Sequence, residues 1–358
     1  MVALLVPLCT VANAAGSQPP SSFSRPTVTA TLRWNLTARS LVRKNLVDPL
    51  WAVRTFALLS VVQHDAAWSA AQFSAGRADR EVLVAAAVAS GSATTLAQIY
   101  PHEVPRIAAD LNADLQSLRE ATPPEDLQRA TALGDSLARL VLRDRQNDGA
   151  VSVEGVIPPY GAGFWRSSEH WPPLRPDWGQ VRPFLIRDIR PFLSSPPPDV
   201  GSSDFAAALA AVREHTRLAS GYNDSISREW ADGPGTATPA GHWNEIAAEL
   251  IARHGLDEVE SARVLALMNM SMMDASIACW RTKYEYWLLR PPHADPQIVP
   301  TMPLPNFPSY PSGHAAFSGA AWTFLSHRFP TEERELRRLA EEAARSRVVS
   351  GIHYPFDA

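Results

Sequence analysis

The last fifth of the chain holds the most informative stretch, Pro311-Ser312-Gly313-His314. Upstream of it come Trp280-Arg281-Thr282-Lys283, six residues and then Arg290-Pro291. Downstream come Ser346-Arg347, five residues, His353, three residues and Asp357. Each of the three blocks combines cationic or proton-carrying side chains with residues that begin or end helices, so the blocks are candidates for one shared site.

The side chains in these blocks suit a tetrahedral oxyanion that carries several negative charges. Arginine binds such oxygens through paired N–H groups, and lysine binds them as a point charge. Ser312 and Gly313, where a helix begins, add a hydroxyl and backbone N–H groups to the same anion. The sequence therefore predicts an oxyanion site.

The spacing predicts how the first two blocks converge. Lys283 and Arg290 are seven residues apart, which on one helix is two turns, or about 10 Å along one face. Pro291 is expected to end that helix, because proline disfavours helical geometry in the preceding residue. Ser312 is expected to cap the next helix, with Gly313 and His314 in its first turn.

The third block predicts a junction between two helices. Gly351 is expected to end one helix, and Pro355 is suited to the first position of another. His353 then lies at the junction, with Asp357 one turn further on and able to orient its ring.

Together the blocks resemble the superfamily that joins type-2 phosphatidic acid phosphatases, bacterial acid phosphatases and vanadium haloperoxidases. The pattern K-x6-R-P, P-S-G-H and S-R-x5-H-x3-D is matched here without a gap. A looser similarity to bacterial haloperoxidase-like proteins extends through most of the chain, at Trp34-Asn35, His64-Asp65-Ala66, Asn147-Asp148-Gly149, Gly163-Phe164-Trp165 and Trp230-Ala231-Asp232-Gly233-Pro234-Gly235.

The resemblance implies a vanadate-dependent haloperoxidase that oxidises a halide with hydrogen peroxide and passes it to an organic acceptor. His353 would be the axial vanadate ligand, Asp357 would orient it, and His314 would take and give protons. The vanadate oxygens would be bound by Lys283, Arg290, Ser312, Gly313 and Arg347.

The same residues allow a phosphatase, because five-coordinate vanadate resembles the transition state of phosphoryl transfer. In this alternative a phosphomonoester binds and His353 attacks it to form a phosphohistidine, while His314 protonates the leaving alkoxide. Phosphate is also expected to occupy the vanadate site. An inactive oxyanion-binding bundle is a third interpretation, and it ranks last because every expected acid, base and nucleophile is present.

Two flanking aromatic residues favour the haloperoxidase over the phosphatase. Trp280 lies three residues before Lys283, and Phe307 lies seven residues before His314. Both positions fit the soluble haloperoxidases that the chain resembles, and a phenylalanine at the second position is similar to the chloroperoxidase type. Trp280 and Phe307 are therefore the predicted lining of a halide and substrate pocket.

Composition and charge narrow the other classes of function. The chain has 358 residues, a formal net charge of −4 and 46% hydrophobic residues, as in an ordinary globular protein. The charge argues against a nucleic-acid partner, and no apolar run approaches the 18 residues of a transmembrane helix. The motifs of conventional zinc sites and the Gly-x-Ser-x-Gly elbow of serine hydrolases are also missing from the sequence. A homo-oligomer is compatible with the sequence.

The two ends of the chain carry separate expectations. Residues 1–17 combine an apolar run with Ala12-Asn13-Ala14, which predicts a signal peptide and an exported protein, periplasmic or secreted. Cys9 would leave with this peptide, so Cys279 would have no partner for a disulfide. The chain stops one residue after Asp357, and we expect the natural C-terminus to lie further on.

Residues 18–358 are expected to form one all-α domain of two packed helical bundles, with the catalytic half at about 201–358. Apolar residues at helical spacing predict helices over 32–46, 49–71, 82–99, 104–119, 124–147, 203–219, 224–230, 242–254, 256–289, 312–327 and 331–349. Residues 149–198 are rich in Pro and Trp and are expected to cover the bundle, with their tryptophans filling gaps; the alternative is a rim around the active-site mouth.

Several residues outside the three blocks could also be mistaken for a site. His64 and Asp65 are expected to be structural. His242 and His293 are alternatives for the pocket lining, His170 is expected to lie at the surface, and Met268, Met270, Met272 and Met273 are expected to pack one helix face.

Overall fold

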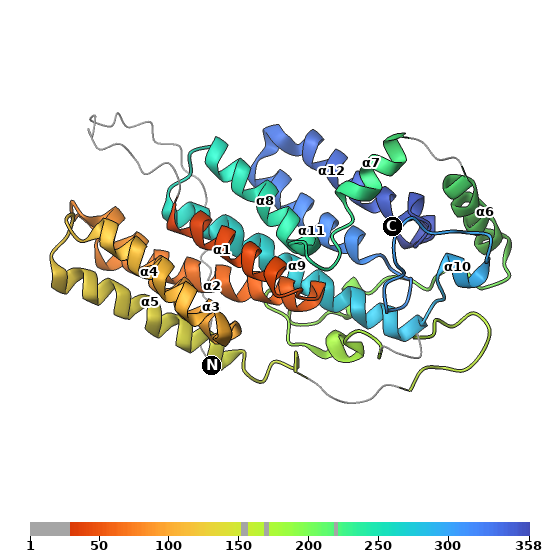
Figure 1. Cartoon of the computed structure of the whole chain (residues 1–358), viewed down its shortest axis with the longest axis horizontal. Helices are drawn as coiled ribbons and strands as arrows, with labels where there is room; N and C mark the ends of the chain where they lie inside the picture. The colour runs from red at the N-terminus through yellow and green to blue at the C-terminus, as the bar shows by residue number, and fades with distance from the viewer. Residues whose placement is uncertain (1–28, 152–156, 168–171, 218–220) are drawn as a thin grey trace.

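The computed structural model describes residues 29–151, 157–167, 172–217 and 221–358 (Figure 1). The signal peptide predicted for residues 1–17, and His170, lie outside these residues. All regular structure in the described part is helical, apart from an isolated bridge between Phe164 and Leu288. The predicted all-α class is therefore confirmed.

The first group of helices comprises α1 (Ala30–Lys44), α2 (Pro49–Phe73), α3 (Arg80–Ile99), α4 (Val104–Leu118) and α5 (Pro124–Asp144). These helices lie together at one end of the elongated molecule in Figure 1. Asp48 caps α2 by accepting hydrogen bonds from Leu50 N and Trp51 N, and Pro49 occupies the first turn, where its missing N–H is harmless.

Small residues allow α3 and α5 to approach closely. A Cβ atom at Gly134 would lie 2.0 Å from the carbonyl oxygen of Ala87, and one at Gly91 would lie 3.1 Å from the carbonyl oxygen of Gly134. Neither position tolerates a side chain at this separation.

Among the helices of the described residues, α3 is the one long and apolar enough to cross a membrane. Of its most apolar stretch of 18 residues, 67% is buried inside the structure.

The long helix α9 (Glu258–Tyr286) joins this group to the rest of the chain. It packs against α2 and also against α11 (Gly313–Arg328), so it is covered along most of its length (Figure 1). Met268, Met272 and Met273 are fully buried and Met270 is 9% exposed, which confirms their packing role. A helix enclosed in this way has little need of a polar face.

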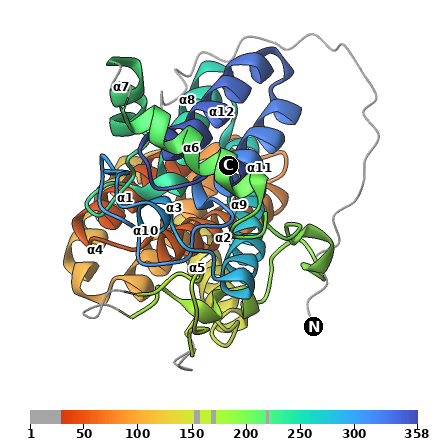
Figure 2. The same cartoon turned by 90° about the vertical axis from the view of Figure 1, so that its right-hand side faces the viewer.

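The remaining helices of the described residues form a second group. It comprises α6 (Ser203–Arg217), α7 (Gly221–Glu229), α8 (Thr238–Arg253), α10 (Pro291–Ala294), α11 and α12 (Glu333–Val349). Figure 1 shows α6 and α7 toward the end of the molecule away from α4 and α5, and in Figure 2 this end faces the viewer. Every predicted helix is present, with ends that differ by a few residues; the largest difference at a start is in α8, which begins at Thr238 rather than residue 242.

The Pro- and Trp-rich segment lies over the bundle, as expected, with two 3-10 turns, Pro176–Gln180 and Arg190–Phe192. Trp178 is buried and donates from Nε1 to Ser276 Oγ at 2.9 Å. The carboxylate of Asp274 accepts hydrogen bonds from three consecutive backbone N–H groups, those of Phe184, Leu185 and Ile186. These bonds attach the segment to α9, because the backbone donors of a loop need partners once they are buried.

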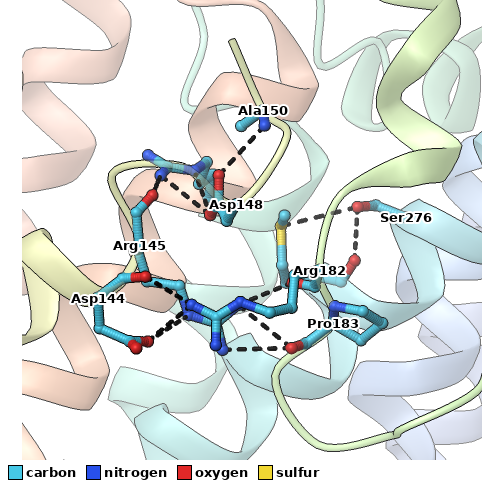
Figure 3. A network of polar contacts seen from close by, with 9 residues as sticks. Asp144, Arg145, Asp148, Ala150, Arg182, Pro183 and Ser276 are labelled. Atoms are coloured by element: carbon cyan, nitrogen blue, oxygen red, sulfur yellow. Dashed lines mark hydrogen bonds and ion pairs between the residues drawn. The ribbon is translucent and has the colours of Figure 1, made fainter. Parts of the chain in front are cut away.

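A network of arginines and aspartates attaches the same segment to α5 and α2 (Figure 3). Arg145 donates to the carbonyl oxygens of Arg182 and Pro183, and Arg182 pairs with Asp144 at 2.8 Å. Asp148 pairs with Arg54 at 3.0 Å. Positive and negative side chains therefore lie in direct contact throughout this network.

Candidate oxyanion site

Seven of the predicted residues meet at one place beside the C-terminal half of α9. We call this group the cradle: Lys283, Arg290, Ser312, Gly313, His314, Arg347 and His353. Burial, together with the charges of Arg290, Lys283, Arg347 and His314, holds the pKa of His353 well below its usual range. Four cationic or protonatable groups from separate elements thus act on one imidazole, and all seven residues belong to the half of the chain expected to be catalytic.

The structure corrects the expected relation between Lys283 and Arg290. α9 ends at Tyr286, four residues before Arg290, so the two side chains do not share a helix face. Trp287 adopts a left-handed conformation, with φ +51°, and Leu288 then forms an isolated bridge with Phe164. Arg290 is the residue before α10, not the last residue of α9.

The helix ends early because backbone groups beyond Tyr286 find partners elsewhere. Trp287 O accepts from Trp165 N at 2.5 Å, Leu289 N donates to Gly163 O at 3.1 Å, and Leu288 O accepts from Ser309 N at 2.9 Å. Trp287, Leu288 and Leu289 are also buried. The covering segment and the loop before α11 therefore hold Arg290 in place.

Lys283 is fully buried and donates from Nζ to two carbonyl oxygens, those of Pro308 and Ser309, each at 2.8 Å. An ammonium group has three donors, so one N–H remains for a ligand. Burial lowers the pKa of Lys283 to about 7, and the neighbouring Arg290 adds to this effect. An anion in the cradle would favour the charged form again.

Arg290 is also fully buried. Its Nε donates to Phe307 O at 3.1 Å and its Nη1 donates to Ile352 O at 2.8 Å. Its Nη2 is buried without a hydrogen-bond partner in the described residues, an arrangement that costs free energy unless a ligand accepts from it. Burial lowers the pKa of this guanidinium to about 9, which leaves it charged at neutral pH.

His353 is held by the carboxylate predicted to orient it. Nδ1 of His353 lies 2.7 Å from Asp357 Oδ2, which also accepts from Ser309 Oγ at 2.5 Å and from Tyr354 N at 3.0 Å. A carboxylate oxygen accepts, so Nδ1 carries the proton and Nε2 keeps its lone pair. Burial raises the pKa of Asp357 to about 6. His353 thus presents Nε2 as a ligand or nucleophile, 3.4 Å from Arg290 Nη1.

Arg347, on α12, is held from three directions. Its Nε donates to Ser346 Oγ at 2.9 Å, its Nη1 to the sulfur of Met302 at 3.3 Å and its Nη2 to the carbonyl oxygen of Trp230. Burial lowers its pKa to about 10, so it too is charged at neutral pH. Sequence reasoning anticipated none of these three partners.

Ser312 caps α11, as predicted, with its hydroxyl 3.4 Å from Ala315 N. A Cβ atom at Gly313 would lie 3.3 Å from the Trp280 ring, which is tighter than a side chain normally packs. The glycine therefore lets the indole lie against the first turn of the helix. Trp280 also packs against Phe307, with ring centroids 5.0 Å apart, so the two predicted pocket residues form one aromatic wall beside Lys283.

His314 lies in the first turn of α11 and is 17% exposed. Its Nε2 has no hydrogen-bond partner in the described part of the chain and lies 3.6 Å from Asp232 Oδ2. Burial and the nearby Arg347 lower the pKa of His314 to about 4, against the smaller opposing effect of Asp232. The ring is therefore neutral at pH 7 and able to accept a proton.

Asp232 and Ser309 were not predicted as site residues. Asp232 is 7% exposed and has φ +45°, a left-handed conformation that is uncommon outside glycine and clusters at functional sites. Burial alone would raise the pKa of Asp232, but the neighbouring rings of His242 and His314 outweigh it and hold that pKa below its usual range. Asp232 lies in the stretch Trp230–Gly235, which resembles haloperoxidase-like proteins, and Ser309 lies between Phe307 and His314. The side chains that these two residues contact come from other parts of the sequence.

Three other predicted positions lie elsewhere. His64 is half-buried beside Asp65, with Nδ1 3.3 Å from Oδ1, and takes no part in the cradle. His293 lines a separate cavity with Leu289 and Asn306. His242 does not contact the cradle directly, but it contacts Asp232.

An oxyanion fits the cradle on the chemistry of these donors. In the described residues, Lys283, Arg290 and Arg347 form no ion pair with a carboxylate. Their donors reach carbonyl, hydroxyl and thioether groups, and one guanidinium nitrogen reaches nothing. Buried cations without a carboxylate are costly, and a multiply charged anion would offset that cost. No cluster of three or more His, Cys, Asp or Glu that could hold a metal cation occurs in the part of the chain described.

Comparison with known proteins confirms the resemblance seen in the motifs. Residues 264–358 match the model of the PAP2 superfamily. The vanadium chloroperoxidase of Curvularia inaequalis is 26% identical over 192 residues, which cover 42% of this chain and 32% of that relative. The chain thus spans about a third of the length of this curated relative.

Two solved structures share the fold over nearly the whole chain. A bacterial vanadium-dependent iodoperoxidase has a TM-score of 0.77 at 22% identity, covering 95% of this chain and 93% of that one. A bacterial vanadium-dependent chloroperoxidase in its holo form has a TM-score of 0.71 at 13% identity, covering 87% and 88%. The likeness extends well beyond the 264–358 segment and includes the N-terminal helices.

Proposed function

We propose that the protein is a vanadate-dependent haloperoxidase, which uses hydrogen peroxide to oxidise a halide. The observation that carries the proposal is the set of three buried cations, Lys283, Arg290 and Arg347, none of which has a carboxylate partner in the described residues. The similar proteins named above as vanadium peroxidases support the identity of the anion.

Each cradle residue has a role that its contacts support. Lys283, Arg290 and Arg347 would hold the vanadate oxygens, together with Ser312 and the Gly313 N–H. His353 would bind vanadium through Nε2, while Asp357 and Ser309 keep the proton on Nδ1. Bound vanadate would supply the activation of peroxide for two-electron oxidation of the halide. His314, neutral at pH 7, would accept the proton that peroxide releases and return it when the product forms.

A soluble phosphatase is the second candidate, because His353 Nε2 is equally placed to attack a phosphomonoester. The haloperoxidase and the phosphatase need different protonation states of His314. A phosphatase needs a protonated His314 at the start, to protonate the leaving alkoxide, whereas peroxide binding needs a neutral one. Without a bound anion, burial and Arg347 favour the neutral ring that the haloperoxidase needs.

Further parts of the proposal concern the surroundings of the site. Trp280 and Phe307 would line the halide pocket, since they form the aromatic wall beside Lys283. A cavity of about 990 Å³ borders Leu289 and Asn306, the neighbours of Arg290 and Phe307 in the chain, and is a candidate site for the organic acceptor. Export is proposed on the apolar character of residues 1–17 alone.

Parallel assays on vanadate-loaded and vanadate-free protein test the function. The loaded protein should halogenate a phenol indicator with peroxide and either bromide or iodide, and phosphate should suppress this activity by competing for the cradle. His314→Ala should lose turnover but still bind vanadate. Arg334→Ala, on the exposed face of α12, is the control and should match the wild type.

The opposite pattern would support the phosphatase. In that case the vanadate-free protein hydrolyses a phosphomonoester, vanadate only inhibits it, and no halide is oxidised at any pH between 4 and 9. Absence of both activities, with vanadate still bound, would favour the inactive oxyanion-binding bundle.

A further inference from the structure

The carboxylate of Asp232 lies beside His314, and a second histidine, His242, lies beside the same carboxylate. Nδ1 of His242, near the start of α8, lies 3.4 Å from both carboxylate oxygens of Asp232. Nε2 of His314 lies 3.6 Å from Oδ2 of the same carboxylate. One buried aspartate therefore lies between two imidazoles, of which only one belongs to the cradle.

The position of His242 is fixed by packing as well as by this contact. Its ring stacks on Trp230, with centroids 4.2 Å apart and planes 20° from parallel. The Trp230 carbonyl in turn accepts from Arg347. His242 is thus joined to the cradle by two routes, through Asp232 to His314 and through Trp230 to Arg347, while its own side chain is 20% exposed to solvent.

The charges around the two rings differ in sign. His242 faces the carboxylates of Asp232, Glu229 and Glu245, which together outweigh burial and raise its pKa. His314 faces Arg347 as well as Asp232, and burial with Arg347 lowers its pKa. The surroundings therefore favour the protonated form of His242, the ring further from the cradle, and the neutral form of His314.

We infer that His242 is a positioning residue: it shares the Asp232 carboxylate with His314 and thereby keeps His314 neutral and free to accept a proton. The negative charge of Asp232 would otherwise act on His314 alone and favour its protonated form. The role of His314 in turnover rests on the proposed function, but the division of Asp232 between the two rings does not.

The test measures the titration of His314 directly, by NMR of histidine-labelled full-length protein with and without bound vanadate. His242→Phe keeps a ring on Trp230 but removes the proton donor. The titration midpoint of His314 in the vanadate-free protein should then rise by about half a pH unit, the size expected for one charge acting through a partly exposed contact. The signal is assigned by its absence in His314→Ala.

The chain offers a closely matched control in His254, at the other end of α8. Its Nε2 lies 3.2 Å from Glu332 and its ring lies 4.8 Å from that of Phe329, so it has the same kinds of neighbour but no link to the cradle. His254→Phe should leave the His314 midpoint unchanged. His242→Gln, which retains a neutral donor, should give a midpoint between those of wild type and His242→Phe, and it serves if the phenylalanine variant does not fold.

An unchanged or lowered His314 midpoint in the folded His242 variants overturns the inference. If the midpoint rises but no halide is oxidised by any form of the protein, the inference stands and the proposed function fails. If both hold, the acid limb of the halogenation profile should move upward with the NMR midpoint in His242→Phe, with vanadate affinity unchanged.

Discussion

Two regions of this molecule hold arginines in networks of polar contacts, and they differ in what the arginines contact. In the network of Figure 3, Arg54 pairs with Asp148 and Arg182 pairs with Asp144. In the cradle, Arg290 and Arg347 contact neutral groups. In the network of Figure 3 the paired arginines attach one segment to another, whereas the two cradle arginines, which have no carboxylate partner among the described residues, belong to the proposed anion site.

The two regions also differ in how completely the donors are used. Arg145 donates from both Nη atoms to carbonyl oxygens, and its guanidinium lies 3.6 Å from the Phe184 ring centroid. Arg290 leaves Nη2 buried and unpartnered among the described residues. Burial lowers the pKa of both guanidinium groups, to about 10 and about 9, so the contacts, and not the burial, separate Arg145 from Arg290, for which we propose a ligand.

The largest expected effect is the loss of turnover when His353 is replaced, compared with a replacement in the network of Figure 3. His353→Ala should reduce turnover at least about a thousandfold, because the group that binds the anion directly is lost. Asp357→Asn should leave turnover within roughly 10- to 100-fold of wild type, since it changes only the orientation of the ring. Steady-state assays of both variants, with Asp144→Asn in the network as control, decide this. Full activity in His353→Ala would remove that residue from the mechanism.

An intermediate effect tests the comparison itself. Arg290→Ala should weaken vanadate binding at least tenfold, because one charge-assisted contact is worth about 2 kcal/mol. Arg145→Ala should leave binding within twofold but lower the free energy of unfolding by about 2 kcal/mol, since two carbonyl oxygens lose the guanidinium that donates to them. Calorimetry and urea unfolding of both variants measure these quantities. Equal effects of the two variants on anion affinity would show that the contrast has no functional meaning.

The smallest expected effect concerns pH. Burial lowers the pKa of Lys283 to about 7, and an anion binds its protonated form, so the affinity of vanadate-free protein for an anion should fall as pH rises through 7. Sulfate is a suitable probe because its own charge is constant in this range. Its affinity should fall by about eightfold between pH 6.5 and 8. Lys283→Arg should flatten this dependence, and a wild-type affinity independent of pH would contradict the lowered pKa.

Much of the architecture could be predicted because it depends on local patterns. Helical spacing of apolar residues located every long helix, and Ser312, Gly351 and Pro355 were expected at helix ends, where the structure has them. The pairing of His353 with Asp357 was also predicted, because the two are four residues apart and need little else to meet.

The expectation for Arg290 failed for a tertiary reason. Nothing in the local sequence Trp287-Leu288-Leu289 ends a helix, and the helical pattern continues through it. The helix ends because Gly163, Trp165 and Ser309 offer backbone partners to these residues, and those partners lie more than a hundred residues upstream and about twenty downstream.

By itself, the sequence determined the helices, the residues of the cradle and the kind of ligand they suit, because helical periodicity, end-capping and side-chain charge are properties of short segments. Tertiary structure alone decided that Asp232 lies between His314 and His242. It also decided that Ser309 donates a hydrogen bond to Asp357, and that the carbonyl oxygen of Trp230 accepts one from Arg347. These contacts arise when separate helices and loops pack together, and burial then shifts the pKa of each group that the packing encloses.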